Sequence, residues 1–301
     1  MRALRRPRQV AGGAVLGTAM LVSLLYPAGA VASAAASALP SCAALQPFSS
    51  KNFPASPRID NRWLPLRPGI DVELSGTVLG DDGLLHKHVI RSTVSSVTKM
   101  IDGVRTLVLY ERDIEDGELQ ESELAFEAQD RGGTVWNMGE YPEEYDSGVL
   151  DGAPSTWIPG LAGARAGTNM PAHPSLRTPA YRQGLARSVG FEDCAKFIHT
   201  AAHTCWAGSC SDHALVSDEW APNDPEGGHQ LKYYVAGIGV VRVGALDGTN
   251  PEVLKLTHRT RLSEAALRRI DRQVLAQDRR GYRVSPHVYG RTKPATISDC
   301  D

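Results

Sequence analysis

The chain has 301 residues, of which 42% are apolar, and its 32 Lys and Arg side chains nearly balance 34 Asp and Glu side chains. This is the composition of a globular protein, and it excludes a disordered polyelectrolyte and a multi-span membrane protein. It does not identify a reaction.

Residues 1–38 have the pattern of a secretory signal peptide. Four Arg residues precede an apolar run from Val10 to Leu25, and small residues with two Ala-x-Ala sites follow. The run is short for a membrane span. We therefore predict a secreted, extracellular protein. Without the four Arg residues the remaining chain is acidic, which argues against a nucleic-acid partner. The stretch Leu39-Pro40-Ser41-Cys42 leaves lipoprotein anchoring at Cys42 as an alternative.

From Ile70 onward, runs of β-forming residues alternate with turns that contain Gly. An extended segment, 39–69, comes first. The predicted strands are Ile70–Leu79, Leu84–Met100, Val104–Ile114, Leu119–Asp130, Thr134–Tyr141, Val189–Thr200, Asp212–Trp220, Gln230–Leu246 and Glu252–Leu262, with an irregular excursion over 142–188. Asp-Gly and Gly-Gly pairs between these runs are hairpin signals, because primed turns need a positive φ. The pattern predicts a mainly β domain over 70–262, an antiparallel meander that curls into an open half-barrel.

Two further features refine this plan. The segment Gly237-Ile238-Gly239 predicts a bulge within the strand Gln230–Leu246. One amphipathic helix is predicted over 263–281, with Ser263 as N-cap and Gly281 at the position after its end, followed by a tail over 282–301. We expect the helix to pack on the β domain.

Several stretches resemble a family of secreted proteins of unknown function from high-GC Gram-positive bacteria. The matching stretches are Ile59–Gly69, Thr98–Thr106, Ala128–Asp130 with Val135–Tyr141, and Tyr233–Val241. The resemblance covers most of 53–262 and carries no assigned catalytic residue. The order of strands and turns is also similar to the open half-barrels of exported lipid- and lipoprotein-binding carriers, a likeness of fold pattern that does not fix function.

Five Cys residues predict disulfides in an exported chain. Cys194 could pair with Cys205 or with Cys210. Alternatively, Cys205 and Cys210 could pair with each other, and Cys42 could pair with Cys300. The sequence leaves these alternatives open.

The histidines offer only weak metal candidates. His199, His203 and His213 lie close to the paired cysteines in sequence, but an oxidising compartment favours disulfides over thiolate ligands. His86 and His88 share one face of a strand and are predicted to be solvated. We predict neither a metal nor a cofactor.

Acidic residues gather over 111–151 and basic residues over 255–293. We predict solvated or mutually packed faces, with the steering of a charged partner as the alternative. Within the acidic stretch, Glu140, Glu143 and Asp146 lie beside aromatic residues. Carboxylates next to a stacking platform are what a glycan hydrolase uses, and such a secreted hydrolase is our alternative function.

The leading hypothesis is binding without catalysis. Aromatic residues along the predicted sheet could line a concave face for an apolar or amphipathic small molecule or a cell-envelope component; these are Trp63, Trp136, Tyr141, Trp157 and Trp220. We expect the protein to act as a monomer.

Overall fold

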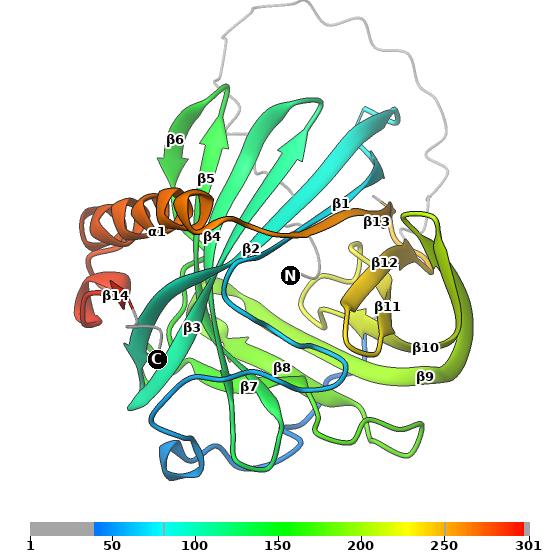
Figure 1. Cartoon of the computed structure of the whole chain (residues 1–301), viewed down its shortest axis with the longest axis horizontal. Helices are drawn as coiled ribbons and strands as arrows, with labels where there is room; N and C mark the ends of the chain where they lie inside the picture. The colour runs from blue at the N-terminus through cyan, green and yellow to red at the C-terminus, as the bar shows by residue number, and fades with distance from the viewer. Residues whose placement is uncertain (1–38, 81, 250, 298–301) are drawn as a thin grey trace, which may run out of the picture.

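The structure, a computed structural model, describes residues 39–80, 82–249 and 251–297 (Figure 1). The predicted signal segment and Cys300 lie outside the described residues. The strands are β1 (Ile70–Leu79), β2 (Leu85–Ile101), β3 (Val104–Glu115), β4 (Glu118–Gln129), β5 (Val135–Asp146), β6 (Val149–Gly152), β7 (Arg165–Met170), β8 (Tyr181–Ala186), β9 (Phe191–Trp206), β10 (Ser209–Trp220), β11 (His229–Val235), β12 (Gly239–Ala245), β13 (Glu252–Arg261) and β14 (Thr296–Ile297). The helix α1 spans Glu264–Val284, and three short 3-10 helices cover Ser50–Asn52, Arg187–Val189 and Tyr289–Arg291.

Twelve strands close into an antiparallel barrel, in the order β1-β13-β12-β11-β10-β9-β8-β7-β5-β4-β3-β2 (Figure 1). The prediction of a mainly β antiparallel fold with one C-terminal helix is confirmed, but the prediction of an open half-barrel is wrong. The first strand hydrogen-bonds on both sides: Ile70 pairs with Arg261 of β13, and Leu79 pairs with Leu85 of β2. That double pairing closes the ring.

Two segments differ from the sequence prediction. The stretch 142–188 is not an irregular excursion, because it contains β6, β7, β8 and the end of β5. The stretch Gln230–Leu246 is a hairpin of β11 and β12 rather than one bulged strand. Gly237 and Gly239 have φ values of 79° and 104° in its turn, and the Gly237 N–H donates to the Arg62 carbonyl. Glycine adopts this left-handed backbone without a Cβ penalty.

The helix α1 begins as predicted, since the Ser263 hydroxyl accepts a hydrogen bond from the Ala266 N–H at 3.3 Å. It runs further than predicted, and Gly281 lies inside it rather than after its end. A Cβ at Gly281 would lie 2.5 Å from Cδ1 of Tyr289. The glycine is therefore needed for close packing and not for a helix stop.

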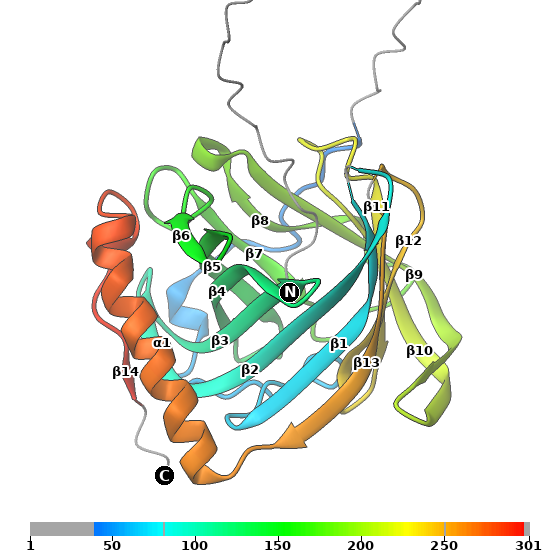
Figure 2. The same ribbon diagram turned by 90° about the horizontal axis from the view of Figure 1, so that it is seen from above.

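The barrel wall has an apolar cluster on each side, and Figure 2 shows α1 lying outside the wall along β2, β3 and β4. Side chains of a strand alternate between faces. On β4, Leu124 and Phe126 point outward into the outer cluster, which includes Val274 of the helix. Ala125 points inward to the lumen cluster with Leu109 of β3. Both faces of these strands are therefore buried.

The extended segment 39–69 covers part of the lumen cluster. Leu64 and Leu66 pack against that cluster, and Ile59 pairs with Leu66 in an isolated bridge. Across the described ranges, α1 and the shorter helical turns lack an apolar stretch that could cross a bilayer.

Candidate functional site

Two cavities lie in the barrel lumen. The larger has a volume of about 110 Å³, and its walls come from β1–β4 and β11–β13 together with the turns beside them. The smaller, of about 70 Å³, lies toward the segment that carries Leu64 and Leu66. Lys232 of β11 lines both cavities, so they are neighbours. A cavity of this size can hold several waters or a small organic group.

The inward faces of β3 and β4 carry a row of carboxyl groups. Glu111 is the cross-strand partner of Glu123, and Asp113 is the partner of Glu121. Period-two alternation therefore puts all four on the lumen side, where they line the larger cavity. Glu127, further along β4, lines the smaller cavity. We call Glu111, Glu121, Glu123 and Glu127 the lumen acids; all four are buried.

Two of the lumen acids, Glu123 and Glu127, are held in an environment that disfavours their charge. Burial raises the pKa of Glu123 well above its usual value, and the nearby carboxyls of Glu140, Glu121 and Glu111 raise it further. Burial likewise raises the pKa of Glu127 to about 8. At neutral pH Glu127 therefore favours the protonated, uncharged form, and the pKa of Glu123 is shifted in the same direction. The sequence prediction of a solvated acidic face is wrong for the lumen acids.

A buried ion pair lies on the opposite side of the lumen. Lys232 Nζ lies 2.7 Å from Glu219 Oε2, and Glu219 Oε1 accepts hydrogen bonds from the Ser217 hydroxyl at 2.7 Å and the Tyr234 hydroxyl at 3.1 Å. Burial by itself lowers the pKa of Lys232, but the carboxylate of Glu219 raises it above the usual value. The charge of the lysine is thus balanced within this pair.

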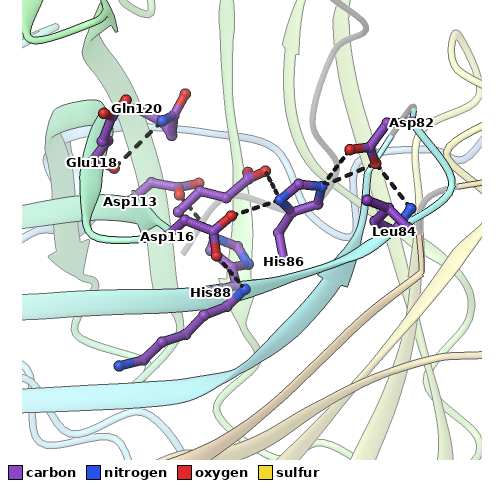
Figure 3. A network of polar contacts seen from close by, with 10 residues as sticks. Asp82, Leu84, His86, His88, Asp113, Asp116, Glu118 and Gln120 are labelled. Atoms are coloured by element: carbon purple, nitrogen blue, oxygen red, sulfur yellow. Dashed lines mark hydrogen bonds and ion pairs between the residues drawn. The ribbon is translucent and has the colours of Figure 1, made fainter.

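Two histidines of β2 lie in a network of polar contacts with carboxyl groups (Figure 3), and one of them, His88, lines the larger cavity. His88 is only 2% exposed; its Nε2 lies 2.8 Å from Asp113 Oδ1 and its Nδ1 lies 2.5 Å from Glu252 Oε1. These contacts tie β2 to β3 and β13. His86, nearer the solvent, lies between Asp82 and Asp116. The prediction that both histidines are solvated is wrong for His88.

The His88 contacts make stability depend on pH. Burial lowers the pKa of His88, but hydrogen bonds to Asp113 and Glu252 outweigh it and raise that pKa from 6.5 to about 9. The contribution of these contacts to folding stability is fully present below pH 6.5 and is lost as the pH rises through about 9.

We expect His88→Gln to lose more stability at pH 6 than at pH 10, measured by urea unfolding. His258→Gln, on the exposed face of β13, is the control. An equal loss at both pH values would contradict the assignment.

The aromatic residues predicted to form one concave face are dispersed. Only Trp63 packs against the lumen cluster. The others occupy separate outer sites: Trp136 and Tyr141 lie in the outer cluster with α1, Trp157 stacks on Phe191, and Trp220 packs beside Cys42 and Cys194. The sheet therefore does not present them together to one ligand.

The carboxylates of the hydrolase alternative are also separated. Glu140 is buried and accepts hydrogen bonds from Asn137 Nδ2 at 2.9 Å and Trp157 Nε1 at 3.2 Å. Glu143 lies beneath α1, where Arg280 donates to both of its oxygens. Asp146 is exposed at the end of β5. Of these three, Glu140 alone is electrostatically close to the lumen acids.

Two disulfides are present among the described residues, Cys42–Cys194 and Cys205–Cys210. The first uses the sulfur that a lipid thioether would need, so it excludes lipidation of Cys42 in the same molecule. It also corrects the pairing of Cys42 with Cys300. The second closes the hairpin of β9 and β10, one of the alternatives left open by the sequence.

The predicted metal candidates do not form one site. His203 Nε2 lies 3.3 Å from Cys205 Sγ, and Cys210 completes an exposed group with them. His199 and His213 are not part of this group. Both sulfurs belong to the disulfide, so neither is a thiolate ligand. The His203 ring pairs instead with Asp212 through Nδ1, at 2.5 Å.

Comparison with known proteins gives no sequence match and a weak structural similarity. The chain matches no protein family model and no curated protein sequence, so its resemblance to a secreted family of high-GC Gram-positive bacteria stays a prediction. Among solved structures it is similar to a Bacteroides fragilis protein with a YmcC-like fold. That similarity has a TM-score of 0.39 and 11% sequence identity, and covers 66% of this chain and 99% of the other. At this level it does not decide the fold or the function.

Proposed function

We propose that the protein binds a small amphipathic molecule in the lumen of its barrel, outside the cytoplasm. The observation that carries this proposal is a cavity of about 110 Å³ whose wall is apolar on one side and acidic on the other. Leu74, Val243 and Leu254 supply the apolar side, and three lumen acids, Glu111, Glu121 and Glu123, supply the polar side. Binding cavities typically combine a mostly apolar lining with a few polar groups that orient the ligand.

The two disulfides support a location in an oxidising compartment, because such bonds persist there and are rare in the cytosol. The aromatic platform expected from the sequence has no part in the proposal. The lumen acids, Lys232 and the aliphatic residues of β1, β12 and β13 take its place.

Three probes with the same six-carbon chain test the proposal: hexylamine, hexanoate and hexan-1-ol. We expect at least one to bind with a stoichiometry of one and a Kd of about 1 mM or tighter by isothermal titration calorimetry. Val243→Trp fills the cavity from β12 and should weaken that binding about tenfold or more. Val253→Trp, on the half-exposed outer face of β13, is the matched control.

Thermal unfolding of both variants shows whether each remains folded. Failure of all three probes to bind the folded wild-type protein would overturn the proposal. Binding that Val243→Trp and Val253→Trp leave equally strong would also overturn it, since the ligand would then lie outside the lumen.

A further inference from the structure

Two buried oxygen atoms in the lumen wall lack a hydrogen-bond partner among the described residues. Glu127 is 2% exposed; its Oε1 accepts from Asn169 Nδ2 at 2.6 Å, while its Oε2 has no partner. Gln230 is 7% exposed; its Nε2 donates to Glu252 at 2.8 Å, while its Oε1 has no partner. Glu127 lines the smaller cavity and Gln230 the larger.

A buried polar atom without a partner is costly, and native proteins rarely keep one. The Gln230 oxygen can only accept a hydrogen bond, and the Glu127 oxygen accepts one whenever its carboxyl is ionised. A ligand that satisfies the Gln230 oxygen and the ionised Glu127 carboxyl must therefore bring N–H or O–H donors to the wall. The two oxygen atoms without partners are an observation separate from the presence of several acids in the lumen.

The charged residues of the lumen favour some ligand headgroups over others. The lysine that lines both cavities is already paired with Glu219 at 2.7 Å, and His88 is held between Asp113 and Glu252. A bound carboxylate would therefore gain no charge pairing from these two groups, and it would be repelled by any lumen acid that is ionised. A hydroxyl could satisfy an acceptor but would balance no charge. An ammonium group offers three donors and a positive charge.

We propose that the ligand carries a primary ammonium group, which donates to the lumen acids while its hydrocarbon part contacts Leu74, Val243 and Leu254. This inference rests on the proposed function and specifies its headgroup. A metal ion is a poorer match, because the smaller cavity, where Glu127 lies, is lined largely by aliphatic side chains and hard cations require six or more oxygen ligands.

Ammonium binding should be linked to proton release. Burial raises the pKa of Glu127 to about 8, so near pH 7 the group must lose a proton to meet a cation as a carboxylate. Each proton released makes affinity rise by about tenfold per pH unit below that pKa. Hexylamine itself stays charged over this range, since amines of this kind titrate near the pKa of lysine.

The test compares hexylamine, hexanoate and hexan-1-ol on the folded protein at pH 6, 7 and 8. We expect hexylamine to bind most tightly and its affinity to rise over this range. Glu127→Gln keeps the size of the side chain but cannot ionise. It should weaken hexylamine binding on the order of tenfold or more at pH 8 and flatten the pH dependence.

Glu118→Gln is the matched control, because Glu118 lies on the same strand, β4, but is exposed at its turn. It should leave both affinity and pH dependence unchanged. Tighter binding of hexanoate or hexan-1-ol overturns the ammonium assignment and leaves the lumen proposal standing. Tighter binding of calcium chloride than of hexylamine, or a Glu127→Gln variant with wild-type affinity, overturns it too. Absence of binding by all three organic probes instead defeats the proposed function.

Discussion

A Lys99→Met variant is expected to lose about 3–5 kcal/mol of unfolding free energy, which is a large fraction of the stability of a typical domain. Lys99 of β2 is 0% exposed on its side chain, and its Nζ lies 2.7 Å from Asp278 Oδ1 in α1. It also donates to the Tyr282 hydroxyl at 3.0 Å and to the Lys293 carbonyl at 2.8 Å. Removing the lysine leaves Asp278 buried without its cation.

Urea unfolding of the folded variant measures this loss. Lys87→Met is the matched control, because Lys87 is exposed on the same strand and its substitution should cost little. Asp278→Asn removes the other charge of the pair and should also be destabilising. If Lys99→Met were no less stable than Lys87→Met, the pair would not anchor α1 to the barrel.

Removing the Cys42–Cys194 disulfide should cost about 5 kcal/mol, because this bond closes a loop with a sequence separation of 152. The bond fastens the segment before the barrel to β9. The entropy that a cross-link removes from the unfolded chain grows with the loop it closes. A Cys42→Ser, Cys194→Ser double variant therefore tests whether the N-terminal segment is held by this bond.

The second disulfide provides an internal comparison. Cys205–Cys210 has a sequence separation of only 5, so the same relation gives about 2 kcal/mol for its removal. Both double variants are compared with wild type by urea unfolding under non-reducing conditions. Equal losses, or a larger loss for the hairpin bond, would show that loop length does not determine their contributions.

Much of the fold can be predicted from the pattern of strands and turns in the sequence. The bounds of β1 match its predicted range. Each end of β2, β3 and β4 lies within one residue of the end predicted for that strand. Turn residues with a positive φ, such as Gly103 and Gly117, mark these hairpins locally. Closure of the barrel could not be predicted in the same way, because pairing of β1 with β13 depends on contacts between residues far apart in sequence.

The candidate site was harder to predict for a reason visible in β4. Its sequence alternates acids with apolar residues, which normally indicates one solvated and one buried face. Here the apolar face packs beneath α1, and the acidic face turns into the lumen. The spacing of Glu121, Glu123 and Glu127 placed them on one face, but only the closed barrel shows that this face is interior.

The aromatic hypothesis failed for a related reason. Trp136 and Tyr141 lie on the side of β5 that faces the outer cluster, and composition alone does not distinguish the two sides of a barrel wall. Their contacts hold α1 and the N-terminal segment in place. These large side chains therefore pack against other elements rather than line a ligand site.

The pairing of β1 with both β2 and β13 has a consequence for how the chain acquires its structure. During synthesis, β1 emerges long before β13, so one edge of the growing sheet has exposed N–H and C=O groups until the last strand arrives. Long-range pairing of this kind slows folding. We infer that ring closure is a late event, and that the interval before it is when the nascent chain is most open to self-association.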